Sequence, residues 1–228
     1  MIITISGMPG AGKGTAAALL AKRLNYPVYS IGDIRRSLAR SRGMTLAEFN
    51  TYGETHPETD LDVDLWQGRM AKKIGRGIFE GRVSYAMIPQ SIRIYLACSI
   101  QEGARRIMQD QQEKRKFEAD HGTYAKTVRS IRRRLKSDRE RYRRYYGLDI
   151  HDRTQYDLVI NTTKLQSTDV QRKIHQFLTE SGFLAKNKDS VNQRWKEWQL
   201  AHRDRVLSTI STKMKKSLNR AKKKSFIP

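Results

Sequence analysis

The stretch MIITISGMPGAGKGT at residues 1–15 decides the fold class of this chain. A short β-branched apolar run at 1–6 precedes a glycine-rich segment, and an alanine- and leucine-rich stretch follows at 16–24. This order predicts a strand, a tight turn and a helix. In that context the Gly-Lys-Gly-Thr sequence at 12–15 is typical of a phosphate-binding loop (P-loop, Walker A) rather than of a turn that only joins two elements.

The chemistry of such a loop comes mainly from its backbone. Glycines allow the N–H groups to turn inward, and together with the positive end of the helix dipole these groups form a nest for phosphate oxygens. Lys13 would reach the β- and γ-phosphates, and the Thr15 hydroxyl would meet phosphate or the magnesium shell. In the usual pattern Ser or Thr directly follows the lysine, whereas here Gly14 stands between them. The residues assigned to ATP are Gly7, Met8, Pro9, Gly10, Ala11, Gly12, Lys13, Gly14 and Thr15.

Length and composition are those of one α/β domain with an appendage. The chain has 228 residues, which is enough to bury a core without disulfides. Its one cysteine, Cys98, lies in the apolar run 92–100 and fits a reducing cytoplasm. No apolar stretch approaches the ~20 residues of a membrane span, and no basic region precedes the first apolar run. We expect a soluble, cytoplasmic monomer without a membrane partner.

The charge is strongly positive and is spread over the whole chain. Lys and Arg number 45 against 23 Asp and Glu, a net charge of +22. Residues 181–228 hold 13 basic and 3 acidic side chains and so carry +10, which leaves +12 for residues 1–180. The positive net charge of both parts therefore predicts an anionic partner, which is nucleotide phosphate, nucleic acid or both.

Alternating apolar runs and amphipathic stretches predict the remaining elements. Strands are expected at 1–6, 26–30, 77–82, 92–98 and 156–161. Helices are expected at 13–24, at 33–42 with Asp33 as N-cap, from a capping box at 45–48, at 57–74, at 101–111, at 123–146 and at 167–178 with a cap in 167–169. The helix at 123–146 holds ten basic residues against Asp138 and Glu140. Such a run of basic residues usually forms a solvated helix face. Like charges one turn apart destabilise a helix, however, and a nearby anion would offset this cost.

Six motifs in this order resemble the nucleoside monophosphate kinases, and in particular the archaeal-type cytidylate kinases. They are the loop at 7–15, SIGDIRR at 30–36, RGMTLAEFN at 42–50, EGR at 80–82, the stretch 134–141 and YYGLDI at 145–150. Many enzymes share the loop, whereas the later motifs are specific. The resemblance covers residues 1–180. It implies a three-layer α/β/α fold with a parallel sheet in the order 2-3-1-4-5, a monophosphate-binding lobe at 33–74 and a lid at 112–145.

The resemblance also implies roles for several arginines. Arg36, rather than the adjacent Arg35, would grip the phosphate of the acceptor, and Arg82 would be directed at the acceptor as well. Arg134, Asp138 and Arg141 would close over the phosphates. Their spacing places these three on one helix face, so that a single hinge could deliver them together. A solvated helix face is the alternative for each of the three.

Carboxylates complete the predicted site. Glu80 ends the strand expected at 77–82 beside the loop, where it would hold magnesium through water, or alternatively cap the next turn. Asp60 and Asp64, one turn apart, would accept a hydrogen bond from the cytosine N4 amine, with an acidic helix face as the alternative. The remaining assignments are Ser30 and Asp33 to the acceptor and Arg106 to ATP.

These features predict transfer of a phosphoryl group from ATP, with Mg²⁺, to CMP or dCMP. The reaction needs positioning and cationic stabilisation, and a lid that excludes water. The alternatives are a kinase of the same fold for AMP or UMP, and an RNA-binding P-loop NTPase that uses the basic tail.

The resemblance stops at residue 181. Phe183 and Leu184 are expected to dock on the core, followed by a helix carrying Trp195 and Trp198. The extension at 181–228 then either packs on the core, binds RNA or another polyanion through its lysines, or forms a disordered end. We expect a docked helix with a loose basic terminus.

Overall fold

The computed structural model describes residues 1–113 and 123–184, together with residues 193, 196, 197 and 200. Trp195 and Trp198 of the predicted tail helix, the lysines from residue 213 onward and residues 114–122 of the expected lid at 112–145 lie outside the described residues. In the described part no helix combines the length and the hydropathy needed to cross a bilayer.

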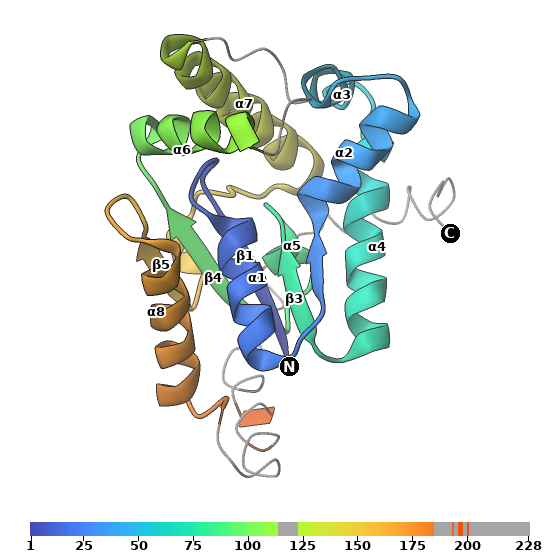
Figure 1. Cartoon of the computed structure of the whole chain (residues 1–228). Helices are drawn as coiled ribbons and strands as arrows, with labels where there is room; N and C mark the ends of the chain where they lie inside the picture. The colour runs from blue at the N-terminus through green and yellow to red at the C-terminus, as the bar shows by residue number, and fades with distance from the viewer. Residues whose placement is uncertain (114–122, 185–192, 194–195, 198–199, 201–228) are drawn as a thin grey trace.

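Five parallel strands form the central sheet (Figure 1). They are β1 (Ile2–Gly7), β2 (Val28–Ser30), β3 (Gly77–Glu80), β4 (Ile92–Ala97) and β5 (Leu158–Asn161). Their order is β2-β3-β1-β4-β5, which confirms the predicted fold class. The central strands β1 and β4 are buried on both faces, as expected for parallel strands that are covered by helices.

Helices cover both faces of the sheet, and neighbouring residues of β1 show how. Ile3 and Ile5 are fully buried in a cluster with α1 (Lys13–Leu24) and α8 (Ser167–Glu180). Ile2, whose side chain points the other way, packs in a cluster with α4 (Glu58–Ile74). The same second face also carries α5 (Ser84–Met87), which was not predicted. These two apolar clusters make the three layers.

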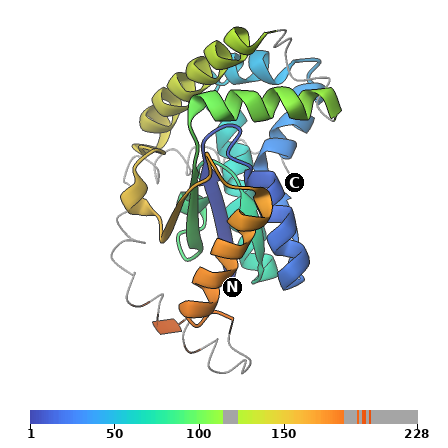
Figure 2. The same cartoon turned by 60° about the vertical axis from the view of Figure 1, so that its left-hand side comes forward.

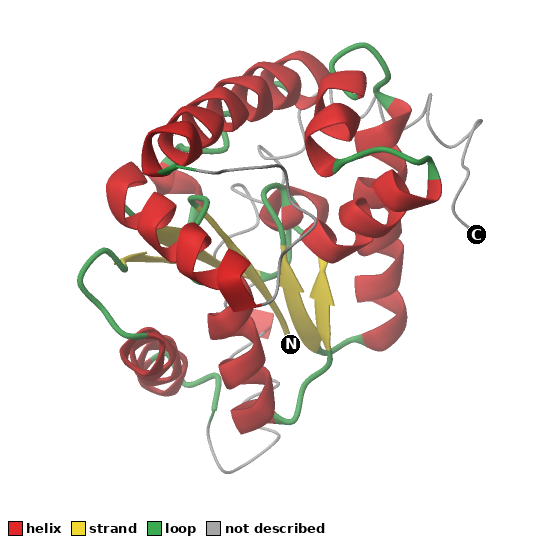
Figure 3. Ribbon diagram, turned by 45° about the horizontal axis from the view of Figure 1, so that its top comes forward, coloured by secondary structure: helices red, strands yellow, loops and turns green. Residues whose placement is uncertain are grey.

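Three helices separate β2 from β3, as predicted, and lie toward the carboxyl edge of the sheet. They are α2 (Ile31–Ser41), α3 (Leu46–Tyr52) and α4. At the same edge α6 (Ile100–Glu113) packs against α7 (Tyr124–Tyr146), and a 3-10 turn at Arg153–Gln155 leads into β5. Figure 3 shows these helices arranged around the ends of the strands. The region over this edge is therefore enclosed by segments from distant parts of the sequence.

The helix starts differ in part from the predicted caps. The capping box is confirmed: the Thr45 N–H donates to Glu48 Oε2 at 2.7 Å, and the Glu48 N–H donates to Thr45 Oγ1 at 3.2 Å. Asp33 as N-cap of α2 is wrong, because the helix already begins at Ile31 and Ser30 Oγ accepts the Asp33 N–H. A cap of α8 within 167–169 is also wrong, since the N-cap is the preceding Gln166.

Two smaller predictions about the core are confirmed. Phe183 is 2% exposed and joins the cluster that holds α1 and α8, with Leu184 partly buried beside it. Cys98 is a buried free thiol directly after β4, and burial raises its pKa. The end of the described domain is thus fastened to the sheet by an aromatic side chain.

Candidate active site

A cavity of about 1140 Å³ lies at the carboxyl edge of the sheet. Its walls come from the glycine-rich loop, α2, the segment after β3, α6, α7 and the loop between β5 and α8. In open α/β sheets, ligands bind outside the carboxyl ends of the strands, where the strand order reverses. The cavity has that position, because β3 and β4 lie on opposite sides of β1.

The glycine-rich loop has a conformation that side chains would prevent. Gly10 has φ +73°, and a Cβ there would lie 2.3 Å from the Gly103 carbonyl oxygen on α6. Gly7 has φ +141°, and a Cβ would lie 2.1 Å from the Leu96 carbonyl oxygen. The backbone therefore passes directly against β4 and α6, and it brings the N-terminus of α1 to the cavity with its N–H groups.

Most of the predicted loop residues reach the cavity. All residues from Pro9 to Thr15 line it, whereas Gly7 and Met8 do not. The Met8 N–H instead donates to the Leu96 carbonyl at 3.0 Å. Lys13 Nζ donates to the Met8 carbonyl at 2.9 Å, which holds the ammonium group across the loop. An ammonium and a helix N-terminus together make a phosphate-binding surface.

A carboxylate and two hydroxyls lie next to the loop. Glu80 ends β3 opposite Ile5 of β1, and its Oε2 accepts a hydrogen bond from Ser30 Oγ at 3.0 Å. Both residues line the cavity, as does Thr15 on the first turn of α1. Among the described residues no cluster of three metal-ligating side chains exists. One carboxylate with hydroxyls nevertheless fits Mg²⁺, which keeps several waters and binds through one or two carboxylates and substrate phosphates.

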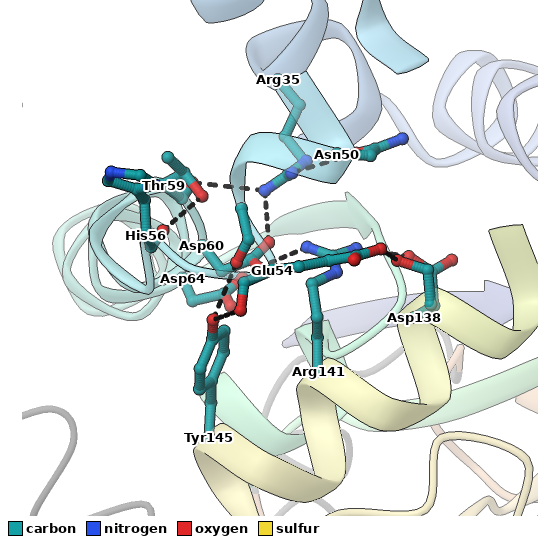
Figure 4. Close-up of polar contacts among 12 residues, drawn as sticks. Arg35, Asn50, Glu54, His56, Thr59, Asp60, Asp64, Asp138, Arg141 and Tyr145 are labelled. Carbon is teal, nitrogen blue, oxygen red and sulfur yellow. Dashed lines mark hydrogen bonds and ion pairs between the residues drawn. The ribbon is translucent and has the colours of Figure 1, made fainter. Parts of the chain in front are cut away.

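A chain of buried ion pairs connects α2, α4 and α7 (Figure 4). Asp60 on α4 accepts from both Arg35 on α2 and Arg141 on α7. Arg141 Nη2 also donates to Asp138 Oδ1 at 2.6 Å, and the other Asp138 oxygen pairs with Arg82, which follows β3. Asp60, Asp138 and Arg141 are each at most 2% exposed. The three elements are therefore held together by charges rather than only by apolar packing.

The charges in this network stabilise one another. Burial favours the neutral form of Asp138, but the guanidinium groups of Arg82 and Arg141 outweigh it and hold the pKa of Asp138 below its usual range. Burial likewise opposes the charge of Arg141, and the Asp60 carboxylate outweighs it and raises the pKa of Arg141. Both shifts favour the charged forms, so the pair of Asp138 and Arg141 stays ionised near neutral pH beside the cavity.

Asp64 differs from its neighbour one turn away. Burial, and secondly the Asp60 charge, raise the pKa of Asp64 to about 7. Tyr146 Oη donates to Asp64 Oδ2 at 2.6 Å, and Gln67 Nε2 donates to Oδ1 at 2.9 Å. Asp60 and Asp64 both line the cavity and are 1% and 3% exposed, so the alternative of a solvated acidic face is wrong.

The predicted arginines take up different positions. Arg36 and Arg82 line the cavity with partly exposed side chains, Arg36 paired with the exposed Asp33. Arg35 also lines the cavity but is engaged with Asp60. Arg134 reaches the cavity from α7, whereas Asp138 and Arg141 on the same face lie behind it in the network. The alternative of a solvated face is therefore wrong for Asp138 and Arg141.

Arg106 has a supporting position at the cavity. Its Nε donates to Glu102 at 2.7 Å, and its Nη2 donates to the carbonyls of Thr162 at 2.8 Å and Leu165 at 3.2 Å. The guanidinium thus holds the loop after β5, whose residues 163–167 line the cavity. Sequence reasoning missed this loop, and the only signal for it was the polar run that follows the fifth strand.

The comparisons with known proteins agree with this geometry. The model of the cytidylate kinase-like family matches residues 2–164, which is more than half of the chain. The chain belongs to the cytidylate kinase-like family. The cytidylate kinase of Methanococcoides burtonii is 30% identical, over 80% of this chain and 99% of that protein. The cytidylate kinase of Pyrobaculum neutrophilum is 36% identical, over 75% of this chain and 89% of that protein.

A solved structure extends the likeness to the fold alone. A shikimate kinase from Acinetobacter baumannii, in complex with shikimate, superposes with a TM-score of 0.51 at 17% identity, over 80% of this chain and 95% of that chain. The two chains therefore share the arrangement of their strands and helices. The family match ends at residue 164, before α8 and the extension that begins at 181.

Proposed function

We propose that the chain is a cytidylate kinase that transfers the γ-phosphoryl group of ATP to CMP or dCMP. The observation that carries the proposal is one cavity that is lined by the phosphate loop, by several arginines and by the buried carboxylates of Asp60 and Asp64. Such a cavity has room for two nucleotides and brings cationic groups to the point where their phosphates meet. The cytidylate kinases among its relatives support the choice of cytosine nucleotides.

The roles of the residues follow from where they lie. Lys13 and the N-terminus of α1 hold the donor phosphates, since both face the loop. Arg36 and Arg82 bind the phosphate of the acceptor, and Arg134 reaches the transferring group from α7. The chemistry needs no dedicated base, because charge spreads over the phosphoryl oxygens and fixed cations stabilise it.

Glu80 and Thr15 are the residues that would hold Mg²⁺ through its waters, and Ser30 fixes the orientation of the carboxylate. When bound, the ion neutralises charge on the phosphate oxygens. The position of Glu80 at the end of β3, in the lining of the cavity, supports this proposal.

Asp64 and Asp60 are the proposed contacts to the acceptor base. A carboxylate oxygen accepts from the exocyclic amine of cytosine, whereas uracil presents an acceptor at the same position. Each carboxylate oxygen has a second lone pair beyond the hydrogen bonds that it makes to protein groups. Arg35, Arg141 and Tyr146 would therefore orient the carboxylates without preventing this contact.

An ADP-release assay with CMP, dCMP, UMP, AMP and GMP tests the proposal. We expect CMP and dCMP to accelerate ATP turnover far more than the other three. Acceleration by UMP or AMP instead would identify a kinase of the same fold with another acceptor. Acceleration by RNA but by none of the monophosphates would contradict the kinase assignment. A cytoplasmic location is part of the proposal, supported by the free thiol of Cys98. The monomeric state and RNA binding by the tail stay predictions.

A further inference from the structure

A row of basic side chains runs along the side of α7 that faces away from the active-site cavity. Its members are Arg129, Arg132, Arg133, Lys136, Arg139 and Arg143. All six are exposed, and none of them lines the cavity. Figure 2 shows α7 along the rim of the molecule, so this outer basic row lies on the surface. The nucleotide site does not account for it.

The charges of the row are only weakly compensated. Glu140 is the one acidic residue of α7 on this side, and its nearest lysine nitrogen, that of Lys136, is 4.0 Å away. Asp149 pairs with Arg139 and Arg143 at the end of the helix, at 2.8 Å each. Within the part of the chain that the structure describes, no carboxylate pairs with the arginines at 129, 132 and 133. Like charges one turn apart cost helix stability, so an external anion would stabilise α7.

A second cavity lies at the carboxyl end of the row. It has a volume of about 580 Å³ and is lined by Lys136, Arg139 and Arg143, and by His151 and Arg153 from the segment before β5. Met8, Tyr95, Leu135 and Glu140 complete its lining. It shares no lining residue with the active-site cavity, but Met8 is followed directly by Pro9 of that cavity, so the two are separate and adjacent. A cationic cavity that continues a cationic row fits a ligand that enters the cavity and also extends along the helix.

The dimensions and chemistry of the row select the ligand. The 23 residues of α7 span about 34 Å, which is longer than a single nucleotide, and the row presents a charge at steps of about 5 Å. Arginine matches phosphate oxygens through its planar fork of donors. A membrane surface would require exposed apolar side chains among the basic ones, and between residues 129 and 143 of α7 every exposed side chain is charged. A ligand with a linear chain of phosphate groups fits both the length and the charge of the row.

We infer that the outer face of α7 binds the phosphodiester backbone of a single-stranded nucleic acid, with the cavity beside His151 and Arg153 at one end of the track. The contact is electrostatic and does not depend on base sequence. It is separate from the kinase reaction, because Arg134, Asp138 and Arg141 occupy the opposite face of the same helix.

The test uses the full chain with three substitutions, Arg129→Gln, Arg132→Gln and Lys136→Gln. The matched control, Lys72→Gln with Lys73→Gln and Arg76→Gln, removes the same charge from exposed residues at the end of α4, near the other edge of the sheet. Binding of a fluorescein-labelled 20-nucleotide uridine oligomer is measured by anisotropy over a series of salt concentrations, with a thymidine oligomer in parallel. Thermal unfolding and ATP turnover with CMP are measured on each variant.

We expect the α7 variant to bind both oligomers at least about tenfold more weakly, with a salt slope smaller by about 2, since each lost phosphate contact removes about 0.7. The α4 control should change affinity less than about twofold, and both variants should keep their melting temperature and their CMP activity. Equal losses in the two variants would overturn the inference, because net charge or the tail would then explain binding. A strict requirement for RNA over DNA would overturn the backbone contact. If the protein binds neither oligomer but sediments with phosphatidylserine vesicles, and the α7 substitutions abolish that sedimentation, the inference is overturned and the row binds a membrane instead.

Discussion

The phosphate loop and the buried ion-pair network lie beside the same cavity but are built in different ways. The loop is nine consecutive residues, and its function comes from backbone N–H groups and one lysine. The network joins Arg35, Asp60, Asp138 and Arg141 from three helices, and its function comes entirely from side chains. The loop needs only its local backbone conformation, whereas the network forms only when the three helices are packed together in the complete fold. The two should therefore fail in different ways when they are mutated.

The largest expected effect is the loss of catalytic activity when the phosphate loop is mutated. Lys13→Ala removes the ammonium that faces the phosphates, so we expect kcat/KM for ATP and CMP to fall by about 10³-fold or more. The melting temperature should stay within a few degrees, because the Lys13 side chain lines the cavity and is only partly buried. Lys22→Ala, an exposed lysine later on the same helix, is the matched control and should keep full activity. Full activity of Lys13→Ala would remove the loop from the reaction.

Mutations in the ion-pair network should instead lower the free energy of unfolding. Asp60→Ala leaves Arg35 and Arg141 without their shared carboxylate in a buried place, so we expect the free energy of unfolding to fall by about 3–5 kcal/mol. Urea denaturation measures the change. The matched control is Asp33→Ala, which breaks an exposed pair with Arg36 and should cost about 0–1 kcal/mol. Equal losses in the two variants would show that the Asp60 pairs do not hold the helices together.

Backbone conformation within the loop gives a smaller effect. Gly10→Ala places a methyl group against the Gly103 carbonyl, at a positive φ. Gly43→Ala imposes a similar positive φ, but its Cβ would have no neighbour within 4 Å. We expect Gly10→Ala to cost about 1–3 kcal/mol more than Gly43→Ala in urea denaturation and also to weaken ATP binding. If the two cost the same and both bind ATP normally, the close approach of the loop to α6 has no role.

Sequence patterns predicted the parts of this site that are local. The loop, the five strands and their order, and the acid at the end of β3 all follow from residues that are adjacent in the chain or from the family resemblance. The partners of Asp60 and Asp64 could not be predicted, because they come from helices about 25 and 80 residues away. A pair of carboxylates one turn apart has the same pattern whether it faces solvent or a set of arginines. The cap of α2 was misplaced for a similar reason, since Ser30 and Asp33 are both good capping residues and only the backbone decides between them.

The smallest expected effect distinguishes the two carboxylates inside the network region. The pKa of Asp64 is about 7 in the folded protein, well above that of an unfolded aspartate, because burial and the Asp60 charge disfavour its ionised form. Between these two pKa values the unfolded chain binds fewer protons than the folded one, so folding stability falls as pH rises and stops falling above about pH 7.

Asp64→Asn removes this titration while it keeps one oxygen to accept from Tyr146. We expect the wild-type protein to lose about 1–2 kcal/mol of stability relative to the variant between pH 6 and pH 8, measured by urea denaturation at a series of pH values. Because the variant differs from the wild type only at this position, the gap between the two curves belongs to Asp64. Parallel curves would mean that Asp64 is ionised throughout this range. In that case the Asp64 carboxylate would already be ionised before CMP binds. Its proposed contact to the base amine would then not require CMP to stabilise the ionised form.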